Sequence, residues 1–263
     1  MDLHLAGKTA FISGSTSGIG FATAQSLLEE GASVIINGRT QASVQHALSR
    51  LKNPMPPAKV DGIAADFSKP EEIQHLCRSL PQIDILINNV GIYHAISFLD
   101  TTDEKWQEQF EVNVMSGVRL SRYLLPAMLD KNWGRILFIS SECATLVPED
   151  LIAYSMTKTA VLAISRGLAQ LTKGTHVTVN AVVPGSTLTE GAEQLLKEMA
   201  EQQGKSLEEV ETDFFTGTRT SSLLQRFAKV EEIAQTITYL ASPRSSATNG
   251  ASIKVDGGSM GGL

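Results

Sequence analysis

The most constraining feature of this sequence is a glycine-rich segment near its start. A short apolar run, Lys8–Ser13 (KTAFIS), leads directly into Gly14–Gly20 (GSTSGIG), and a helical pattern then continues to Gly31. A strand, a glycine-rich turn and a helix in this order can hold a nucleotide phosphate, because the backbone can approach it closely and the helix N-terminus offers unpaired N–H groups. The spacing Gly14-x-x-x-Gly18-x-Gly20 is not the common G-x-G-x-x-G fingerprint, and such turns also serve plain chain reversal. The order of the elements favours nucleotide binding.

The next predicted strand, Ser33–Asn37 (SVIIN), completes a βαβ unit, and the residues after it bear on cofactor choice. In NAD sites an acidic side chain there binds the ribose 2′-hydroxyl, whereas arginine accommodates the 2′-phosphate of NADP. Here the chain has Asn37-Gly38-Arg39, without a carboxylate. NADP is therefore the preferred cofactor, with NAD as the alternative and an exposed turn charge as the other interpretation of Arg39.

Further predicted strands also end in polar or turn-forming residues. Asp66 follows the strand Val60–Ala65 and could bind an adenine amino group, although an N-cap or turn role is an equal alternative. Asn88-Asn-Val-Gly91 follows the run Ile83–Ile87, and Pro184-Gly185-Ser-Thr-Leu-Thr189 follows Val177–Val183. Either segment could contact a nucleotide or simply turn the chain. A last strand is predicted at Ala251–Val255, and the prolines of Asn53–Pro57 predict a surface loop.

Composition indicates an ordinary globular protein that acts on small molecules. At 263 residues the chain suits one large α/β domain, and its formal net charge of −6 leaves no basic stripe for nucleic acid. Cys77 and Cys143 are too few and too scattered for a disulfide framework or a zinc site, so we predict no metal and a reducing, cytoplasmic location. We expect no secretory signal and no membrane span.

The segment Ser140–Thr159 carries the strongest catalytic candidates. Within a predicted helix over about 151–171, Tyr154 and Lys158 lie one turn apart on the same face. The ammonium would favour the phenolate and lower the tyrosine pKa, which suits a general acid or base. Ser141, at the end of an apolar run, could hydrogen-bond a substrate oxygen. By chance alone, however, Tyr-x-x-x-Lys occurs in many helices where the lysine only packs along the ring.

Two other segments have predicted roles near that site. Asn113 falls within one or two long helices predicted from Asp103 to Leu129, where asparagine is unfavourable. Either its side chain or a local distortion there has a function, or it is a buried amide bonded to neighbouring backbone. The polar, helical segment 190–226 is predicted to be a lid over the substrate. The predicted substrate pocket comprises Ile92, Tyr93, His94, residues 142–147 and the lid, whose apolar side would present Phe214, Phe215, Leu223 and Leu224. His94 and Glu142 could bind a polar substrate group, but a solvated rim is the favoured interpretation of both.

Taken together, these motifs resemble the short-chain dehydrogenase/reductase (SDR) family in its single-domain form. The matching positions are Gly14-x-x-x-Gly18-Ile-Gly20, Asp66, Asn88-Asn-Val-Gly91, Asn113, Ser141, Tyr154-x-x-x-Lys158, Pro184-Gly185 and Asp256-Gly-Gly. They run in the family's order along nearly the whole chain, and the core is similar to 3-oxoacyl-carrier-protein reductases. Ser13 stands where threonine is usual, Val90 replaces the usual alanine, and the 190–226 segment is longer than in those reductases.

The resemblance implies a Rossmann-like, doubly wound α/β fold with a seven-stranded, mostly parallel sheet and helices on both faces. It also implies a homotetramer or homodimer, catalytic roles for Asn113, Ser141, Tyr154 and Lys158, and hydride transfer between a nicotinamide and a ketone or 3-oxoacyl-type substrate. The alternatives are an NAD-linked alcohol or sugar dehydrogenase working oxidatively, and a non-catalytic nucleotide-binding protein. The implied cofactor contacts are Gly14, Ser15, Thr16, Ser17, Gly18, Ile19, Gly20, Arg39, Asp66, Phe67, Asn89, Gly91, Tyr154, Lys158, Pro184, Gly185, Thr187 and Thr189.

Overall fold

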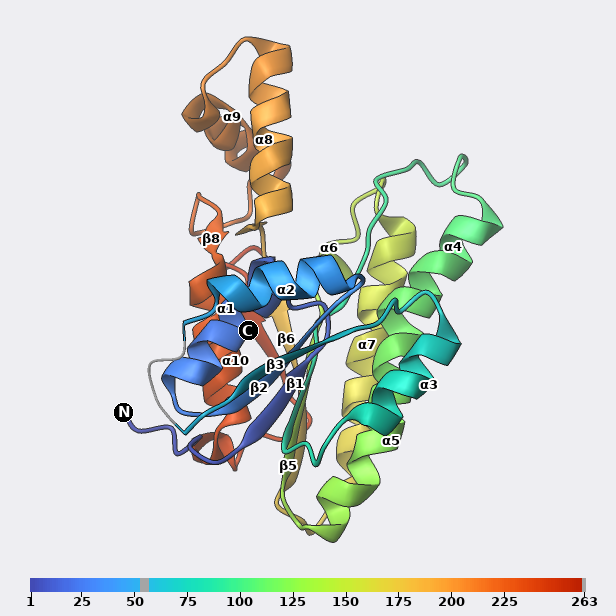
Figure 1. The fold of residues 1–263 in the computed structure, drawn as a ribbon. Coiled ribbons are helices and arrows are strands. Elements are labelled where there is room, and N and C mark those ends of the chain that lie inside the picture. Colours follow the sequence, from blue (N-terminus) through green and yellow to red (C-terminus); the bar gives the residue numbers. More distant parts are fainter. Residues whose placement is uncertain (53–56, 262–263) are drawn as a thin grey trace.

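A parallel sheet runs through the centre of the molecule. The computed structural model describes residues 1–52 and 57–261, so most of the predicted proline-rich loop, residues 53–56, lies outside the described residues. Within that part of the chain, seven parallel strands are arranged in the order β3-β2-β1-β4-β5-β6-β9 (Figure 1). Their bounds are β1 Thr9–Ile12, β2 Ser33–Gly38, β3 Val60–Ala64, β4 Ile85–Asn88, β5 Gly134–Ile139, β6 Val177–Pro184 and β9 Ser252–Val255. The predicted doubly wound α/β fold is thereby confirmed.

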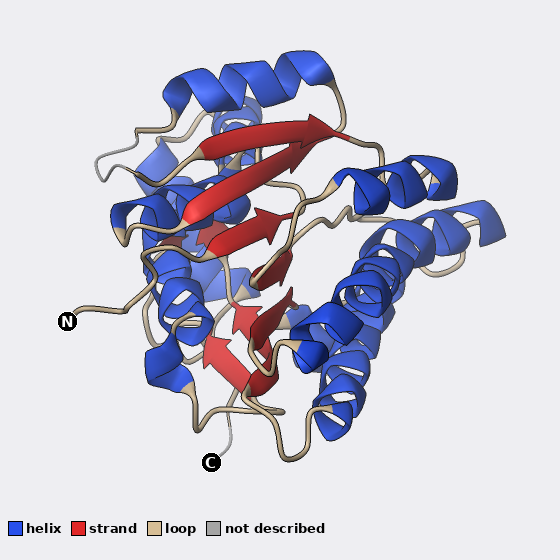
Figure 2. Ribbon diagram, turned by 60° about the horizontal axis from the view of Figure 1, so that its bottom comes forward, coloured by secondary structure: helices blue, strands red, loops and turns tan. Residues whose placement is uncertain are grey.

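Helices cover both faces of this sheet (Figure 2). The first face carries α1 Gly18–Glu29, α2 Gln41–Arg50 and α10 Val230–Ala241; the second carries α3 Pro70–Ser79, α5 Ser116–Asp130 and α7 Ile152–Leu171. Side chains of one strand alternate between the faces. In β1, Ala10 and Ile12 pack with the first set of helices and Phe11 with the second. Strands buried on both faces must be apolar throughout, which is why the sequence shows them as short continuous apolar runs.

The helical stretch predicted from Asp103 to Leu129 is interrupted. It consists of α4 Asp103–Phe110, the π-helical turn η1 Glu111–Met115 and then α5. A π-turn carries one extra residue per turn and is frequently found at functional sites. Asn113 lies in η1, so the local distortion that its position suggested is present.

The segment after β6 forms a separate group of elements. It comprises β7 Thr187–Leu188, α8 Glu190–Gln203, α9 Leu207–Asp213, the π-turn η2 Phe214–Thr218 and β8 Ala228–Lys229. Figure 1 shows α8 and α9 standing away from the sheet. They have a small core of their own, formed by Leu196, Ala200 and Val210. The chain also contains two short helices, α6 Cys143–Leu146 and η3 Pro243–Ser245.

The sheet topology fixes where a ligand can bind. The chain leaves β1 toward β2 and β3 on one side, and later returns to place β4, β5 and β6 on the other. In open α/β sheets, ligands bind at the carboxyl ends of the strands where the order reverses in this way. Among the described residues, no helix is both long and apolar enough to cross a membrane.

Candidate active site

Eight of the residues predicted to bind the cofactor line one cavity of about 730 Å³. The cavity lies at the carboxyl ends of β1, β2 and β3, beside the point where the strand order reverses. A cavity of this size suits a small-molecule ligand such as the adenosine half of a dinucleotide. The eight residues are Gly14, Thr16, Ser17, Arg39, Asp66, Phe67, Asn89 and Gly91.

The glycine-rich turn is held against the loop after β4 by a compact set of hydrogen bonds. The Ser13 hydroxyl accepts from the N–H groups of Asn89 and Val90, at 3.0 and 3.1 Å. The Asn89 side chain in turn donates to the carbonyl of Gly14 at 2.7 Å. A methyl group added to Gly14 would lie 2.9 Å from the Val90 Cα. Only glycine therefore fits where the glycine-rich turn contacts the loop after β4. Ser13, the conservative departure from the family pattern, thus still braces the turn.

The N-terminus of α1 borders this site and has the backbone groups that suit an anion. Its N-cap residue, Ser17, makes no side-chain cap, so it leaves the first-turn N–H groups available. The Gly18 N–H donates to the carboxylate of Glu190 at 2.7 Å, and Arg50 lies 3.7 Å from the same carboxylate. This helix end therefore holds an anionic group supplied by the chain, as expected for a phosphate site. The residues present fit a dinucleotide whose pyrophosphate would lie here.

Two predicted cofactor residues, Ser15 and Gly20, take part in packing around the glycine-rich turn. The Ser15 hydroxyl is fully buried; it donates to the Ile12 carbonyl and accepts from the Asn37 N–H. A Cβ on Gly20 would lie 2.5 Å from the Asn89 Nδ2, so Gly20 permits close packing of α1 on β4. Neither residue lines the cavity, and both hold its walls in place.

Arg39 and Asp66 lie at the outer end of the same cavity. Arg39 is exposed and forms no hydrogen bond or salt bridge with the described residues, so its guanidinium is available to a ligand. One oxygen of Asp66 accepts from both the N–H and the hydroxyl of Ser68, and the backbone hydrogen bond is the main cause that lowers the Asp66 pKa. The turn role considered for Asp66 is therefore present, and the residue also lines the cavity.

A second cavity, of about 360 Å³, adjoins the first at Asn89, Gly91 and Ile92. It brings together three of the four predicted catalytic residues, Ser141, Tyr154 and Lys158, although Ser141 and Tyr154 lie on different elements. The predicted cofactor residues Ile19, Pro184, Gly185, Thr187 and Thr189 also line it. The two cavities therefore lie side by side, and a nicotinamide that extended from the first into the second would meet Tyr154.

The electrostatics of Tyr154 and Lys158 differ from the sequence-based expectation. Burial of the phenol raises the pKa of Tyr154, and a hydrogen bond with Ser141 only partly offsets this. Burial likewise lowers the pKa of Lys158 to about 8, while its ammonium donates to the Ile139 carbonyl at 2.9 Å. The expected lowering of the Tyr154 pKa by Lys158 is therefore not seen. Loss of water is the main cause of both shifts, because the charged form of each group is disfavoured in the interior.

Asn113 is close to the site but does not line either cavity. Its amide donates to the Ile92 carbonyl and the Thr157 hydroxyl, at 2.8 and 3.0 Å, and its oxygen accepts from the Ile92 N–H at 2.7 Å. Both side-chain N–H donors are satisfied within the chain. The amide thus fixes the loop after β4 to α7, which is the second of the two interpretations drawn from the sequence.

The substrate side of the cavity contains an ion pair that the sequence did not predict. Glu142 is buried, not part of a solvated rim, and its carboxylate accepts from the Arg219 Nε at 3.0 Å and the Ser186 hydroxyl at 3.1 Å. All three residues line the cavity. No sequence pattern pointed to Arg219, since the paired residues are 77 positions apart.

The other predicted substrate contacts divide into two groups. Ile92 and Tyr93 line the cavity, with the Tyr93 ring 5.9 Å from that of Tyr154, whereas His94 lies 3.3 Å from Glu108 and points elsewhere. The predicted apolar face of the lid does not line either cavity. Phe214 and Phe215 pack against Phe227 instead, and the N–H groups of Leu223 and Leu224 donate to the Gly257 carbonyl.

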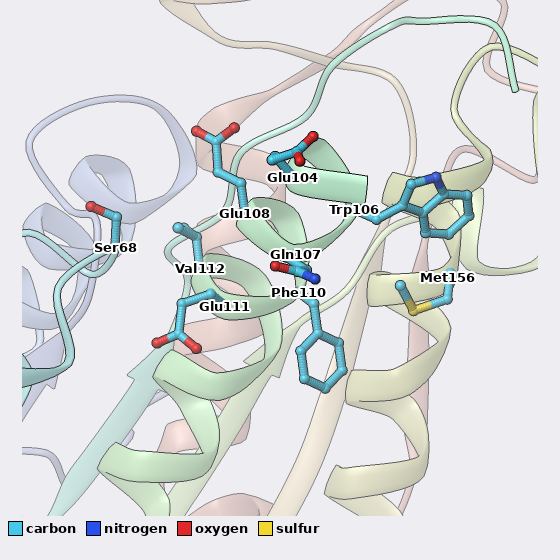
Figure 3. A pocket seen from close by; sticks show the side chains of 9 residues that line it. All are labelled: Ser68, Glu104, Trp106, Gln107, Glu108, Phe110, Glu111, Val112 and Met156. Atoms are coloured by element: carbon cyan, nitrogen blue, oxygen red, sulfur yellow. The ribbon is translucent and has the colours of Figure 1, made fainter. Parts of the chain in front are cut away.

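A third hollow, of about 720 Å³, lies outside the cofactor cavity along α4 and shares Ser68, Glu108 and Val112 with it. Figure 3 shows the apolar side chains of Trp106, Phe110 and Met156 on the side of this hollow toward α7. Phe110 is 41% exposed at this hollow.

Comparisons with known proteins agree with this arrangement. The family model described as enoyl-(acyl carrier protein) reductase matches residues 14–260. The uncharacterized oxidoreductase YvaG of Bacillus subtilis is 47% identical over 258 residues, covering 98% of each chain. The 3-oxoacyl-[acyl-carrier-protein] reductase FabG of Vibrio cholerae is 29% identical over 97% of this chain and 98% of its own.

Among solved structures, L-sorbose reductase from Gluconobacter frateurii, crystallised with NADPH and L-sorbose, superposes with a TM-score of 0.93 at 31% identity, covering all of both chains. The matched length, the sequence identities and the superposition all agree on one family. This chain therefore belongs to the short-chain dehydrogenase/reductase family and is an NAD(P)-dependent oxidoreductase.

Proposed function

We propose that this protein is an NADP(H)-dependent reductase that converts a ketone, or a 3-oxoacyl-type carbonyl, to a secondary alcohol. The observation that carries the proposal is that Ser141, Tyr154 and Lys158 converge in a cavity that opens onto the predicted cofactor cavity. A carbonyl group placed between them would face a hydroxyl and a phenol on one side and the nicotinamide site on the other.

In this mechanism the bound nicotinamide supplies the hydride, and the chain controls the proton. Tyr154 donates its phenolic proton to the carbonyl oxygen as general acid, and Ser141 orients that oxygen by a hydrogen bond. Lys158, held by the Ile139 carbonyl, places a positive charge beside the developing alkoxide. Burial raises the Tyr154 pKa, so the phenol is protonated at neutral pH and can supply the proton that reduction requires.

Tyr154→Phe tests this role. We expect the variant to lose turnover by at least about 10²-fold, the usual contribution of general acid catalysis, while its NADPH affinity stays within about twofold of the wild type. NADPH-dependent ketone reduction and NADPH fluorescence titration measure the two quantities. Tyr123→Phe, which changes a half-exposed tyrosine on α5, is the matched control. Substantial reductase activity in Tyr154→Phe would exclude Tyr154 as the acid.

The preference for NADP rests on Arg39, which lines the adenosine end of the cavity and has no salt-bridge partner among the described residues. The related L-sorbose reductase was crystallised with NADPH. We expect NADPH to bind at least about tenfold tighter than NADH, and Arg39→Ala to reduce that ratio to within about threefold of one. Reduced-nicotinamide fluorescence at physiological salt measures both affinities. Equal binding of the two cofactors by the wild type would favour the NAD-linked alternative.

An oxidative sugar or alcohol dehydrogenase remains the second candidate function. The similarity to L-sorbose reductase favours a sugar-like substrate, whether the enzyme works as a reductase or as a dehydrogenase. The segment 190–226 serves as the substrate lid in both cases, since Ala192 and Arg219 line the cavity.

The location is cytoplasmic, a proposal supported by two buried cysteines that form no disulfide.

The assembly is a homotetramer or homodimer. An apolar hollow between α5 and α7, lined by Val118, Leu125, Leu129, Ile164, Leu168 and Leu171 among others, supports it, because a second copy of the chain would cover these side chains. Light scattering on the purified chain measures its mass in solution.

A further inference from the structure

Arg219 is a cation that the segment 190–226 contributes to the cavity of Tyr154. It follows the π-turn η2, where its backbone N–H donates to the Phe214 carbonyl at 2.9 Å and its guanidinium lies 5.8 Å from the Phe214 ring. Together with the hydrogen bond from Nε to Glu142, these contacts hold a side chain that is 14% exposed. A guanidinium held in this way loses little entropy when it binds a ligand.

The guanidinium has a hydrogen-bond donor left for a ligand. Nε donates to Glu142, and Nη1 makes only a long contact of 3.4 Å with the Thr218 carbonyl. Nη2 makes no hydrogen bond with the described residues, yet it is not enclosed. The free oxygen of Glu142, in contrast, is fully enclosed. A ligand in the cavity can therefore reach the donor of this ion pair but not its acceptor.

Cys143 indicates where the guanidinium lies relative to the reacting groups. Cys143 lines the cavity, and its backbone N–H donates to the Ser141 hydroxyl at 3.2 Å. Burial is the main cause that raises the pKa of the Cys143 thiol, and the Ser141 hydroxyl and the nearby Arg219 side chain partly offset it. Arg219 is thus close to the loop that carries Ser141, the residue expected to hold the substrate carbonyl.

The chemistry of the ion pair defines which groups Arg219 can take. A guanidinium only donates hydrogen bonds, so the ligand must present an acceptor oxygen. Glu142, whose side chain is 4% exposed, balances the charge of Arg219, and a substrate carboxylate would lose its water without gaining an unpaired cation there. Lys158, the remaining charged residue in the cavity lining, donates to the Ile139 carbonyl. An uncharged acceptor, such as an ester carbonyl or a hydroxyl oxygen, suits Arg219 best.

We propose that Arg219 determines substrate specificity by donating a hydrogen bond to a second oxygen of an uncharged substrate, in the position of the acyl carbonyl of a 3-oxoacyl group. The inference rests on the proposed function, which places the carbonyl that is reduced at Tyr154 and Ser141 in the same cavity. Glu142 is a positioning residue that orients the guanidinium and weakens its attraction for a substrate carboxylate.

The first test compares an oxoester with a matched ketone on the enzyme saturated with NADPH. Methyl 3-oxobutanoate and hexan-2-one have chains of equal length, and only the ester has a second carbonyl. The variants are Arg219→Met and the double variant Glu142→Gln with Arg219→Met, which leaves no unpaired carboxylate. The control is Arg226→Met, which removes an arginine of the same segment that is 43% exposed and paired with Glu232.

We expect the ratio of kcat/KM for the ester to kcat/KM for hexan-2-one to fall at least about tenfold in both Arg219 variants, because a hydrogen bond from a charged donor contributes this much to discrimination. Arg226→Met should keep the wild-type ratio. Comparing variants cancels the greater intrinsic reactivity of the oxoester, and NADPH affinity checks that each variant is folded. An unchanged ratio in a folded Arg219 variant would overturn the inference. An equal loss for both substrates would also overturn it, because Arg219 would then only hold the lid in place.

A charge variant gives a second readout, which a purely structural role would not move. Glu142→Gln keeps the size of the side chain but leaves the charge of Arg219 unbalanced. We expect kcat/KM for the 3-oxobutanoate anion, relative to its methyl ester, to rise at least about fivefold in this variant. The double variant, which lacks the guanidinium, should show no such gain. Absence of the gain in Glu142→Gln would contradict the role assigned to the ion pair.

A binding measurement separates this inference from the proposed function. Saturation-transfer NMR with methyl 3-oxobutanoate and hexan-2-one, on the enzyme without cofactor, reports recognition of the second oxygen without any turnover. Stronger binding of the ester to the wild type and to Arg226→Met, but not to Arg219→Met, supports the inference even if no ketone is reduced, in which case only the proposed reaction fails. Equal binding of the two compounds to the wild type contradicts the role of Arg219.

Discussion

At the scale of single residues, Lys158 is a predicted catalytic side chain whose burial lowers the stability of the folded protein. Its side chain is nearly fully buried, forms no salt bridge among the described residues, and donates its one described hydrogen bond to the Ile139 carbonyl. Burial lowers its pKa from 10.5 to about 8. At pH 7 the lysine is charged in both the folded and unfolded chain, so folding carries the cost of removing the ammonium from water.

Lys158→Met should therefore stabilise the fold while abolishing activity. The difference between 10.5 and about 8 corresponds to a few kcal/mol, part of which is lost with the hydrogen bond to Ile139. We expect a net gain in unfolding free energy of about 1–2 kcal/mol at pH 7. The gain should shrink as the pH rises from about 8 toward 10.5, because the wild-type lysine loses its proton on folding in that range.

Urea unfolding at pH 7 and at higher pH measures this difference. Lys173→Met, which removes an exposed lysine just after α7, is the control and should change stability by less than about 0.5 kcal/mol. If Lys158→Met proves less stable than the wild type at pH 7, the hydrogen bond to Ile139 outweighs the cost of burial.

At the scale of secondary-structure elements, α8 is tied to the cofactor site through its first residue. Thr189 caps the helix by accepting from the Ala192 N–H, and Glu190 extends from the first turn to the Gly18 N–H. The first turn of α8 is thus joined to the first turn of α1. A cofactor pyrophosphate that uses the same N–H groups must displace the Glu190 carboxylate.

Replacing Glu190 should therefore tighten cofactor binding. We expect Glu190→Ala to lower the Kd for NADPH by about threefold or more, because a competing anion worth up to about 1 kcal/mol at a helix N-terminus has been removed. Fluorescence titration measures this Kd. Glu193→Ala, one turn further along α8, removes an exposed carboxylate that pairs with Lys197 and should leave the Kd unchanged. Weaker NADPH binding by Glu190→Ala would show that the carboxylate assists the cofactor.

The π-turn η1 shows what can be predicted at this scale. Asparagine is unfavourable inside a helix, so Asn113 indicates an irregularity from the sequence alone. The sequence left two interpretations of its side chain, and three hydrogen bonds to Ile92 and Thr157 support the structural one. A single sequence could not reveal those partners, because they belong to segments distant in the chain.

At the scale of the whole molecule, local patterns predicted the fold well and long-range pairs poorly. The apolar runs and glycine-rich turn correspond to strands and the turn between β1 and α1, because short-range periodicity and turn chemistry determine them. The Glu142–Arg219 and Gly18–Glu190 contacts span 77 and 172 positions. They depend on how the 190–226 segment packs, and no local pattern encodes that. Burial likewise decided the pKa values of Tyr154 and Lys158, and burial is a property of the folded chain.

The packing of α1 against α10 has a consequence for how the protein is made. The two helices are neighbours on one face of the sheet, where Leu27 and Leu28 share a core with Ile237 and Leu240, and Thr238 donates to Ser26. On a ribosome, the nucleotide-binding segment emerges first, but the helix that covers it is synthesised about two hundred residues later. The nascent chain must therefore carry the uncovered apolar side of α1 through most of translation, and native packing around the glycine-rich turn is completed only after synthesis nears its end.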